Sequence, residues 1–251
     1  MAKALESGQN PRRMAATPRT PRRILVLDVG GTHVKIRVGR GAMQRFVSGP
    51  DMTPALMVRE LRRRAPQLAY DAVSIGYPGV VFRDRIVAEP HNLGKGWVGF
   101  DFAQALGRPV RIVNDAAMQA IGSYRGGRML FLGLGTGLGV TLVLDGVIEP
   151  TEFGHVAYRN GLTYEDYLGE RGRKLRGNKK WRKSVSEVVA HLQAAFEVDY
   201  VVLGGGNAAR LKNLPPGARL GANSNAFAGG VRLWQQRGGR LVPSAGAGRG
   251  R

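Results

Sequence analysis

Two glycine-rich segments, about a hundred residues apart, have the composition of phosphate-binding turns. The first, LDVGGTHVK, covers residues 27–35, and the second, LGLGTGLG, covers residues 132–139. Glycines let backbone N–H groups approach an anion without interference from a Cβ, and threonine adds a hydroxyl donor. Asn114 and Asp115 lie between the two segments in sequence. Two phosphate turns and a candidate base together indicate phosphoryl transfer.

The first segment carries a carboxylate that a plain hairpin turn does not need. Asp28 ends a predicted buried strand at 24–29, and Gly30, Gly31 and Thr32 follow directly. A buried carboxylate beside a phosphate turn is explained by bound Mg²⁺, because the carboxylate alone would repel the ligand. The segment lacks the GxxxxGK[ST] pattern of a P-loop. A simple hairpin turn is the alternative interpretation.

The second segment contains GxGxxG, which is typical of dinucleotide-binding folds when a helix follows it at once. Here VTLVLDGVIEP follows instead, with Asp145 and Gly146 as the turn of a β-hairpin. The sequence therefore excludes the dinucleotide fold. It favours a hairpin that holds phosphate oxygens through backbone N–H groups.

Asp115 stands between a predicted strand at 110–113 and a predicted helix at 116–124. A carboxylate there is placed to accept a proton from a substrate hydroxyl that attacks phosphorus, while Asn114 orients the same hydroxyls. The alternative is that Asp115 only caps the helix. Glu152, His155 and Glu165 allow two interpretations as well, as ligands of a substrate or as polar surface.

Composition excludes several classes of protein. The chain has 251 residues and no cysteine, so disulfides, thiolate metal sites and cysteine nucleophiles are absent, and with only four histidines zinc is not expected. No run of about eighteen apolar residues exists to span a membrane. The first residues are basic without an apolar segment, unlike a secretory signal. We therefore predict a cytoplasmic protein.

The formal net charge is +20, and much of it is clustered. Two clusters lie in the terminal segments and a third is internal, comprising Arg171, Arg173, Lys174, Arg176, Lys179, Lys180, Arg182 and Lys183. One interpretation is a solvated surface. The other is a polyanion site, for which nucleic acid and inorganic polyphosphate both qualify, since clustered cations bind phosphate chains by releasing counterions.

The order of predicted elements is approximately repeated. Each half opens with a glycine-tipped hairpin, and further strands and helices follow. We predict an α/β protein of two similar lobes with a substrate cleft between them. The predicted divisions are a disordered basic tail at 1–22, a small lobe at 23–113, a larger lobe at 114–235 and a flexible basic tail at 236–251.

Seven motifs resemble, in order, those of the ROK family of bacterial sugar kinases. They are DVGGTHVK, GYPG, NLGKGW, VNDA, LGLGTGLG, EFGH and LGGGN, and they run from about residue 24 to residue 234. The NLxxxW pattern and the compact size are most similar to the polyphosphate glucokinase branch of the family. The resemblance implies a two-lobed actin-like ATPase fold, of the ribonuclease H-like class, with glucose between the lobes.

The resemblance also assigns residues. It implies a general base at Asp115 and substrate contacts at Asn92, Asn114, Glu152, His155 and Glu165. It implies phosphate or nucleotide contacts at Asp28, Gly30, Gly31, Thr32, Lys35, Gly135, Thr136, Gly137, Gly139, Gly204, Gly205 and Gly206, with Asp28 also as the metal residue. From the internal basic cluster we predict polyphosphate contacts at Arg171, Arg173, Lys174, Lys179 and Lys180.

Most ROK kinases carry a cysteine-rich zinc motif, which this chain lacks. The polyphosphate glucokinase branch lacks the motif as well, so its absence favours that branch. That motif brings a further sugar-binding glutamate, whose place Glu165 would take. The implied partners are glucose or a similar hexose, Mg²⁺, ATP or polyphosphate as donor, and a second copy in a homodimer. The alternative class is a non-catalytic protein that binds nucleic acid or another polyanion through its charge.

Overall fold

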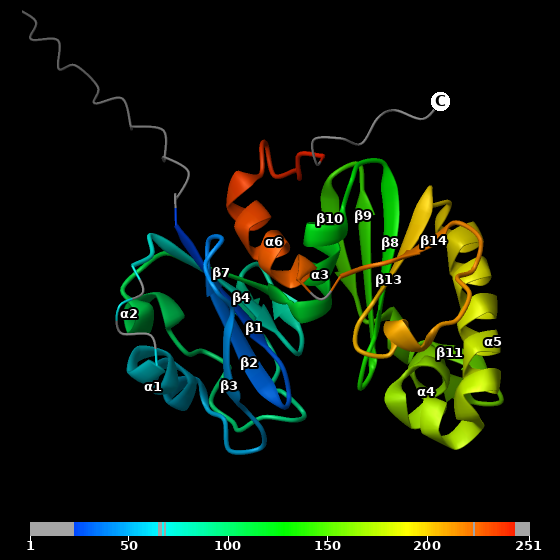
Figure 1. Cartoon of the computed structure of the whole chain (residues 1–251), viewed down its shortest axis with the longest axis horizontal. Coiled ribbons are helices and arrows are strands. Elements are labelled where there is room, and N and C mark those ends of the chain that lie inside the picture. Colours follow the sequence, from blue (N-terminus) through cyan, green and yellow to red (C-terminus); the bar gives the residue numbers. More distant parts are fainter. Residues whose placement is uncertain (1–22, 65–66, 68, 223, 244–251) are drawn as a thin grey trace, which may run out of the picture.

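The computed structural model describes residues 23–64, 67, 69–222 and 224–243. The predicted tail at 1–22 lies outside the described residues, as do residues 244–251 of the other predicted tail. Two five-stranded sheets stand side by side with helices on their outer sides and two helices between them (Figure 1). None of the helices in this described part is both long and apolar enough to cross a membrane.

The first sheet has the strand order β3-β2-β1-β4-β7. Its strands are β1 (Ile24–Val29), β2 (His33–Val38), β3 (Gln44–Val47), β4 (Ala72–Tyr77) and β7 (Val110–Asn114). β3, β2 and β1 are antiparallel neighbours, whereas β1, β4 and β7 run parallel. The carboxyl ends of three parallel strands therefore meet at one edge.

The second sheet repeats this plan in the order β10-β9-β8-β13-β14. Its strands are β8 (Arg128–Leu134), β9 (Leu138–Leu144), β10 (Val147–Thr151), β13 (Tyr200–Gly204) and β14 (Ala218–Leu220). An antiparallel meander again leads into two parallel pairs. The approximate duplication predicted from the order of elements is confirmed.

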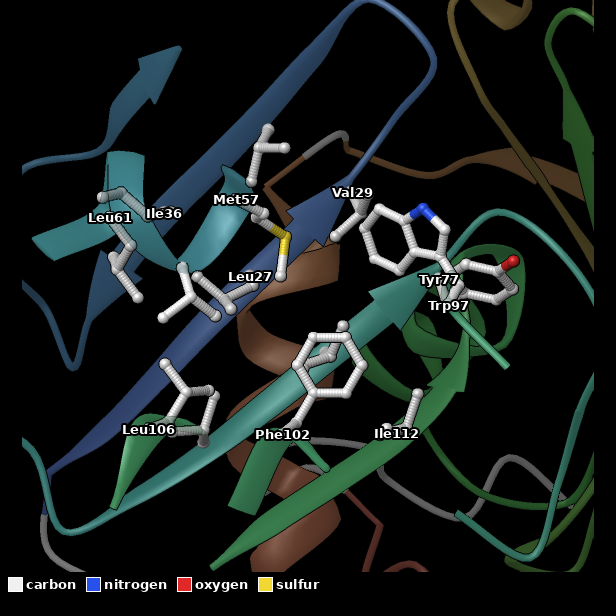
Figure 2. Packing of buried hydrophobic residues seen from close by; sticks show 14 of the residues in the cluster. Leu27, Val29, Ile36, Met57, Leu61, Tyr77, Trp97, Phe102, Leu106 and Ile112 are labelled. Atoms are coloured by element: carbon white, nitrogen blue, oxygen red, sulfur yellow. The ribbon is translucent and has the colours of Figure 1, made fainter. Parts of the chain in front are cut away.

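Two helices cover the outer face of the first sheet, α1 (Pro54–Arg64) and α2 (Phe102–Leu106). Thr53 caps α1 by accepting the N–H of Leu56 at 3.2 Å, ahead of proline at the first helical position. The side chains between this layer and the sheet form one apolar core, in which Trp97 and Tyr77 are fully buried (Figure 2). The indole N–H of Trp97 donates to the carbonyl of Met52 at 3.2 Å.

Two further helices, α4 (Tyr164–Leu168) and α5 (Glu170–Phe196), cover the outer face of the second sheet. α5 buries Trp181 and the apolar positions that follow it at helical spacing, against Leu130, Leu132 and Val201 of the sheet. At Gly177 the backbone leaves the helical region with φ of +73°, so α5 is two helical segments joined by a kink.

Between the sheets lie α3 (Asp115–Ser123) and α6 (Asn225–Arg232), which follow β7 and β14 in the two halves (Figure 1). They cross at glycines. A Cβ on Gly122 would come within 1.9 Å of the carbonyl oxygen of Asn225, and one on Gly229 within 1.8 Å of that of Met118. α6 also packs on β1, where a Cβ on Gly230 would meet Val26 at 2.5 Å. In sequence α6 belongs to the second half, but in space it joins both.

The structure also contains several short elements. They are the hairpins β5 (Val81–Phe82) with β6 (Arg85–Ile86) and β11 (Ala157–Arg159) with β12 (Leu162–Thr163), and the 3₁₀ turns η1 (Phe153–His155), η2 (Ala208–Arg210) and η3 (Leu233–Gln235). The described part of the C-terminal tail differs from the predicted flexible segment. Leu241 is buried there, and its N–H donates to the carbonyl of Gly146 at 2.8 Å.

Candidate active site

Asp28 and Asp115 meet at the edge where the parallel strands of the first sheet end. Asp28 lies opposite Gly76 in the register of β1 and β4, and Tyr77 lies opposite Asn114 in that of β4 and β7. Asp115 follows at once as the first residue of α3. A Cβ on Gly76 would come within 2.4 Å of the terminal methyl of Met118 in the same helix, and it would lie 3.5 Å from the Cα of Asp115. A glycine between the two acidic positions thus lets the helix start close to the sheet, which the sequence analysis missed although GYPG marks it.

Asn114, rather than Asp115, caps the helix. Its side-chain oxygen accepts the N–H groups of Ala116 and Ala117 at 2.9 and 3.2 Å, and its amide donates to the carbonyl of Gly79 at 3.1 Å. The capping alternative for Asp115 therefore loses its main support. The predicted contact between Asn114 and a sugar competes with these bonds.

Asp115 is only partly accessible, and its surroundings disfavour the ionised form. Burial raises the pKa of this carboxyl to about 7, with further repulsion from Asp28 and a smaller one from Glu152, against a bond from the N–H of Ala116. A base that titrates near neutral pH is well matched to accept a proton and release it again. Geometry and pKa both favour Asp115 as the proton acceptor of the site.

The first glycine turn connects β1 to β2 and is tied to the end of β3. The N–H of Gly30 donates to the carbonyl of His33 at 3.0 Å, and the hydroxyl of Ser48 donates to the carbonyl of Gly30 at 2.5 Å. Asn92 packs on the turn, since a Cβ on Gly31 would lie 3.2 Å from its Cβ. The predicted residues Gly30, Gly31, Thr32 and Asn92 are thus brought together in one place.

Lys35 lies directly opposite Asp28 in the register of β1 and β2, and its Nζ is 3.1 Å from Oδ2 of that carboxylate. The pair unites two residues that the sequence assigned to one phosphate motif. A cation beside Asp28 offsets the repulsion that this carboxylate would exert on a phosphate.

The second glycine turn connects β8 to β9. The N–H of Gly135 donates to the carbonyl of Gly137 at 3.1 Å, and that of Leu138 donates to Oε2 of Glu165 at 2.9 Å. The N–H groups of Thr136 and Gly137 are then the donors of this turn that best suit a phosphate. Gly135 has open space beside it, with no atom within 4 Å of a Cβ there.

The predicted phosphate-binding glycines of the second lobe divide into two groups. Gly139 and Gly204 provide packing space, because a Cβ would meet Ala116 at 2.5 Å in the first case and Phe131 at 2.5 Å in the second. Gly205 has φ of +81°, which favours glycine, whereas Gly206 is open. Gly135 and Gly206 are therefore the glycines of this set with open space where a Cβ would stand.

Of the predicted sugar ligands, Glu152 directly precedes η1 and His155 is its last residue. Their side chains are 56% and 61% exposed, and Nε2 of His155 is 3.4 Å from Oε2 of Glu152. Glu152 follows the last residue of β10, and its charge acts on Asp115. These two polar groups therefore face solvent close to the proposed base, as a pair available for hydroxyls.

Glu165, predicted to contact the sugar, lies against the second glycine turn. Its Oε2 accepts the N–H of Leu138, and a Cβ on Gly137 would come within 2.3 Å of the same oxygen. Glu165 sits in the first turn of α4, which Thr163 and Asp166 start as a capping box. The Glu165 carboxylate is thus in contact with the second glycine turn.

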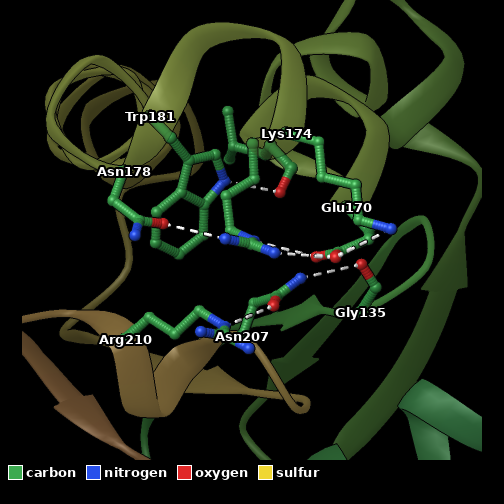
Figure 3. A network of polar contacts seen from close by, with 9 residues as sticks. Gly135, Glu170, Lys174, Asn178, Trp181, Asn207 and Arg210 are labelled. Atoms are coloured by element: carbon green, nitrogen blue, oxygen red, sulfur yellow. Dashed lines mark hydrogen bonds and ion pairs between the residues drawn. The ribbon is translucent and has the colours of Figure 1, made fainter.

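A polar network joins the second glycine turn to the start of α5 (Figure 3). Glu170 binds Arg173 through two bonds of 2.7 and 2.8 Å and lies 3.6 Å from Nζ of Lys174. Asn207, which the sequence analysis left out of the site although LGGGN contains it, is buried and donates to the carbonyl of Gly135 at 3.2 Å. Hydrogen bonds with the side chains of Arg173 and Asn207 lower the pKa of the Glu170 carboxyl to about 2.

The network shows that the cations of the internal basic cluster are not equally accessible. Arg173 also donates to Asn178 at 2.9 Å, and its side chain is only 13% exposed. Its guanidinium is thus largely engaged within the protein. The other predicted polyphosphate residues are exposed on α5, with Arg171 and Lys174 before the kink at Gly177 and Lys179 and Lys180 after it. They are the ones that a long anion can reach.

The side chains that could bind Mg²⁺ at this site meet its requirements only in part. Among the described residues no group of three or more His, Asp or Glu side chains is arranged to hold a metal. Mg²⁺ commonly needs just one or two carboxylates when phosphate oxygens and water complete its shell. Asp28, beside the first glycine turn, fits that requirement. When bound, the ion would supply charge neutralisation at the transferred phosphate.

Two hollows of the described surface lie elsewhere. One is lined by Arg23, Tyr70 and Arg108, and another by Val58, Arg59 and Phe100 on α1 and its neighbours. Neither includes Asp28 or Asp115. The assignment of the site therefore rests on side-chain chemistry and backbone geometry.

Comparison with known protein families gives a match to the ROK family model over residues 24–162, more than half of the chain. The chain belongs to the ROK family. The match ends shortly before α4, so the α4–α5 region that holds Glu165 and Glu170 lies beyond it.

Among known proteins, polyphosphate glucokinase of Mycobacterium tuberculosis (strain H37Rv) is 25% identical over 203 residues, covering 72% of this chain and 76% of that protein. Kanosamine kinase of Amycolatopsis mediterranei (strain S699) is 27% identical over 255 residues, covering 76% and 83%. Both relatives are named as kinases.

Two solved structures support the same fold. The polyphosphate/ATP-glucomannokinase of Arthrobacter sp. strain KM superposes with a TM-score of 0.70 at 24% identity, covering 85% of this chain and 98% of that one. The ROK glucokinase of Streptomyces griseus, solved with glucose and AMPPNP, has a TM-score of 0.66 at 17% identity, covering 86% and 100%. The predicted two-lobed actin-like fold is confirmed.

Proposed function

We propose that this ROK protein transfers a phosphoryl group from ATP or polyphosphate to the 6-hydroxyl of glucose or a close hexose. The observation that carries the proposal is Asp115, a partly buried carboxyl with a pKa near 7 beside Asp28 and the first glycine turn. The names of the relatives, polyphosphate glucokinase and kanosamine kinase, support a sugar as acceptor.

In this proposal Asp115 takes the proton of the attacking hydroxyl. Glu152 and His155 bind further hydroxyls from the exposed side of the site, and Asn92 borders it at the first turn. The N–H groups of the two glycine turns and the Lys35 ammonium stabilise the transferred phosphoryl, aided by Mg²⁺ at Asp28. Preorganised donors of this kind act without reorganising during the reaction.

For the donor we propose that long phosphate chains are guided by the exposed cations of α5. Replacing Lys179 and Lys180 by glutamine should raise KM for polyphosphate several-fold and leave KM for ATP unchanged, because only the long chain reaches them. The effect should fade in high salt, where such contacts are screened. Equal effects on both donors would count against this role.

The function itself is tested by a hexose phosphorylation assay with ATP and with polyphosphate side by side. Glucose 6-phosphate is expected with at least one of the donors. Absence of product from glucose, mannose and kanosamine with either donor would overturn the proposal. The alternative, a non-catalytic protein that binds nucleic acid, is supported only by the net charge. A nucleic-acid binding assay at physiological salt tests it.

A further inference from the structure

The first glycine turn is held by a side chain outside the predicted site residues, that of Ser48. Its hydroxyl donates to the carbonyl of Gly30 at 2.5 Å, and its backbone N–H donates to the carbonyl of Thr32 at 3.0 Å. Ser48 follows directly after β3, whose last residue, Val47, lies opposite His33 in the register of β2 and β3. One residue thus fixes two peptides of the turn from the side of β3.

The hairpin between β1 and β2 is only half closed. In a closed two-residue hairpin, the residues on either side of the turn exchange two backbone bonds. The N–H of Gly30 donates to the carbonyl of His33 at 3.0 Å, but within the described residues the return bond, from the N–H of His33 to the carbonyl of Gly30, is not formed. Gly31 and Thr32 keep negative φ, and turns without positive φ splay their strands. The hydroxyl of Ser48 takes the place of the missing donor.

The two bonds of Ser48 set the direction of two N–H groups. In a trans peptide the N–H points away from the carbonyl of the preceding residue. Because the carbonyls of Gly30 and Thr32 point to Ser48, the N–H groups of Gly31 and His33 point to the opposite side. The described residues offer neither N–H a backbone acceptor. Two such donors on one side of a turn suit an anionic oxygen.

The loop that follows Ser48 is anchored in the core of the first lobe. The carbonyl of Met52 accepts the N–H of Gly94 at 3.1 Å and the indole N–H of Trp97 at 3.2 Å, and Trp97 is fully buried (Figure 2). The same segment carries Asn92, which packs on the turn. The backbone of Ser48 is therefore fixed, so its hydroxyl sets the geometry of the turn rather than following it.

We propose that Ser48 is a positioning residue that directs the N–H groups of Gly31 and His33 at the phosphoryl group being transferred. The proposal rests on the function proposed above and deepens it, since it names the groups of the first turn that contact the phosphoryl. Donors that are already oriented need no reorganisation when charge develops during the transfer. Without the hydroxyl, the carbonyl of Gly30 would accept the return bond, and the N–H of His33 would be lost to the phosphate.

Steady-state kinetics with glucose and each phosphate donor test this role. Ser48→Ala should lower kcat by about 3–10-fold, the size of one lost hydrogen bond. The loss should be the same with ATP and with polyphosphate, because both donate the same group. Glucose affinity in the absence of a donor, measured by calorimetry, should stay close to wild type. Ser48→Thr keeps the hydroxyl and should recover kcat.

Backbone amide NMR gives a readout that a merely structural role would not move. A non-hydrolysable ATP analogue should shift the amide resonances of Gly31 and His33 in the wild-type protein, and Ser48→Ala should abolish the shift at His33. Ser184→Ala is the matched control, because it also removes a hydroxyl bonded to a carbonyl, that of Lys180 at 3.3 Å within α5. It should change neither kcat nor these shifts.

Three kinetic outcomes would overturn the inference. The first is an unchanged kcat in Ser48→Ala, and the second is a loss that Ser48→Thr does not recover. The third is a fall in glucose affinity as large as the fall in kcat, which would place the effect at the acceptor. If the wild-type protein phosphorylates no hexose, the proposed function fails, and the amide resonances alone decide the inference. Absence of a shift at Gly31 and His33 in the wild-type protein would then overturn it.

Discussion

The two sheets have the same strand order, but they differ at the position just before each glycine turn. In the first sheet this row holds Asp28, with Lys35 and Gly76 as its neighbours in the register. In the second sheet the equivalent row is Gly133, Gly139 and Gly204. One row carries charges, and the other carries only glycines.

The difference has a physical reason in α3. The first turn of this helix lies between the two rows: Asp115 is close to Gly76, and Ala116 is 2.5 Å from the position of a Cβ on Gly139. Side chains in the second row would push the helix away from that sheet. The glycines of the second sheet thus allow α3 to lie close enough to place Asp115 beside the charged row of the first sheet. The two halves therefore contribute differently to the site.

The largest expected effect comes from Asp115→Asn. Loss of a positioned base should lower kcat by about 10²–10⁴-fold. The same change should stabilise the protein above pH 7. The raised pKa of Asp115 means that its contribution to stability is present below pH 4 and is lost as the pH rises through about 7. At pH 8 the variant should be more stable by up to about 4 kcal/mol, and at pH 4 equal to wild type.

Chemical denaturation at both pH values, together with turnover, checks this prediction. Asp101→Asn is the control, because Asp101 also starts a helix and asparagine caps as well as aspartate. It should change neither activity nor the pH dependence of stability. Near-wild-type kcat in Asp115→Asn would remove this residue from the role of base.

A pair of glycine variants tests the division of tasks in the second turn. Gly139→Ala should destabilise the protein by about 1–3 kcal/mol, because its Cβ meets Ala116 at 2.5 Å and the helix must shift. Gly135→Ala meets nothing within 4 Å, so its free energy of unfolding should change by less than about 1 kcal/mol. Its KM for the donor should rise instead. Similar losses of stability in both variants would contradict the division.

The smallest expected effect is a shift in the pKa of Asp115. Asp28→Asn removes a negative charge that raises this pKa, so the value should fall, and Glu152→Gln should lower it by less. NMR titration of the Asp115 carboxyl follows the pKa directly, without relying on activity that Asp28 itself supports. A rise of the pKa in either variant, or a larger fall in Glu152→Gln, would show that this order of influences is wrong.

Much of the site could be predicted because local patterns determine it. The continuous apolar run before Asp28, the glycines after it and the hairpin turn at Asp145 and Gly146 are read within a few neighbouring residues. The positive φ values of +50° and +87° at that turn agree with the predicted hairpin. Asp115 is marked by a local pattern too, the change from strand to helix.

Contacts between distant segments could not be predicted this way. Nothing near Glu165 in sequence indicates a bond to Leu138, 27 residues away. Gly139 and Gly204 resemble phosphate-binding glycines, yet packing against Ala116 and Phe131 accounts for them. In sequence Arg173 is one cation of a basic cluster, whereas in the structure it is bonded to Glu170 and Asn178.

The sequence by itself determined the family, the order of the elements and the residue types of the site, because each follows from short motifs and from periodicity along the chain. Tertiary structure decided which of these residues share a place and which are occupied by their neighbours. The reason is geometric: a carboxylate or a glycine has a different role depending on what packs within a few ångströms of it, and those neighbours come from far along the chain.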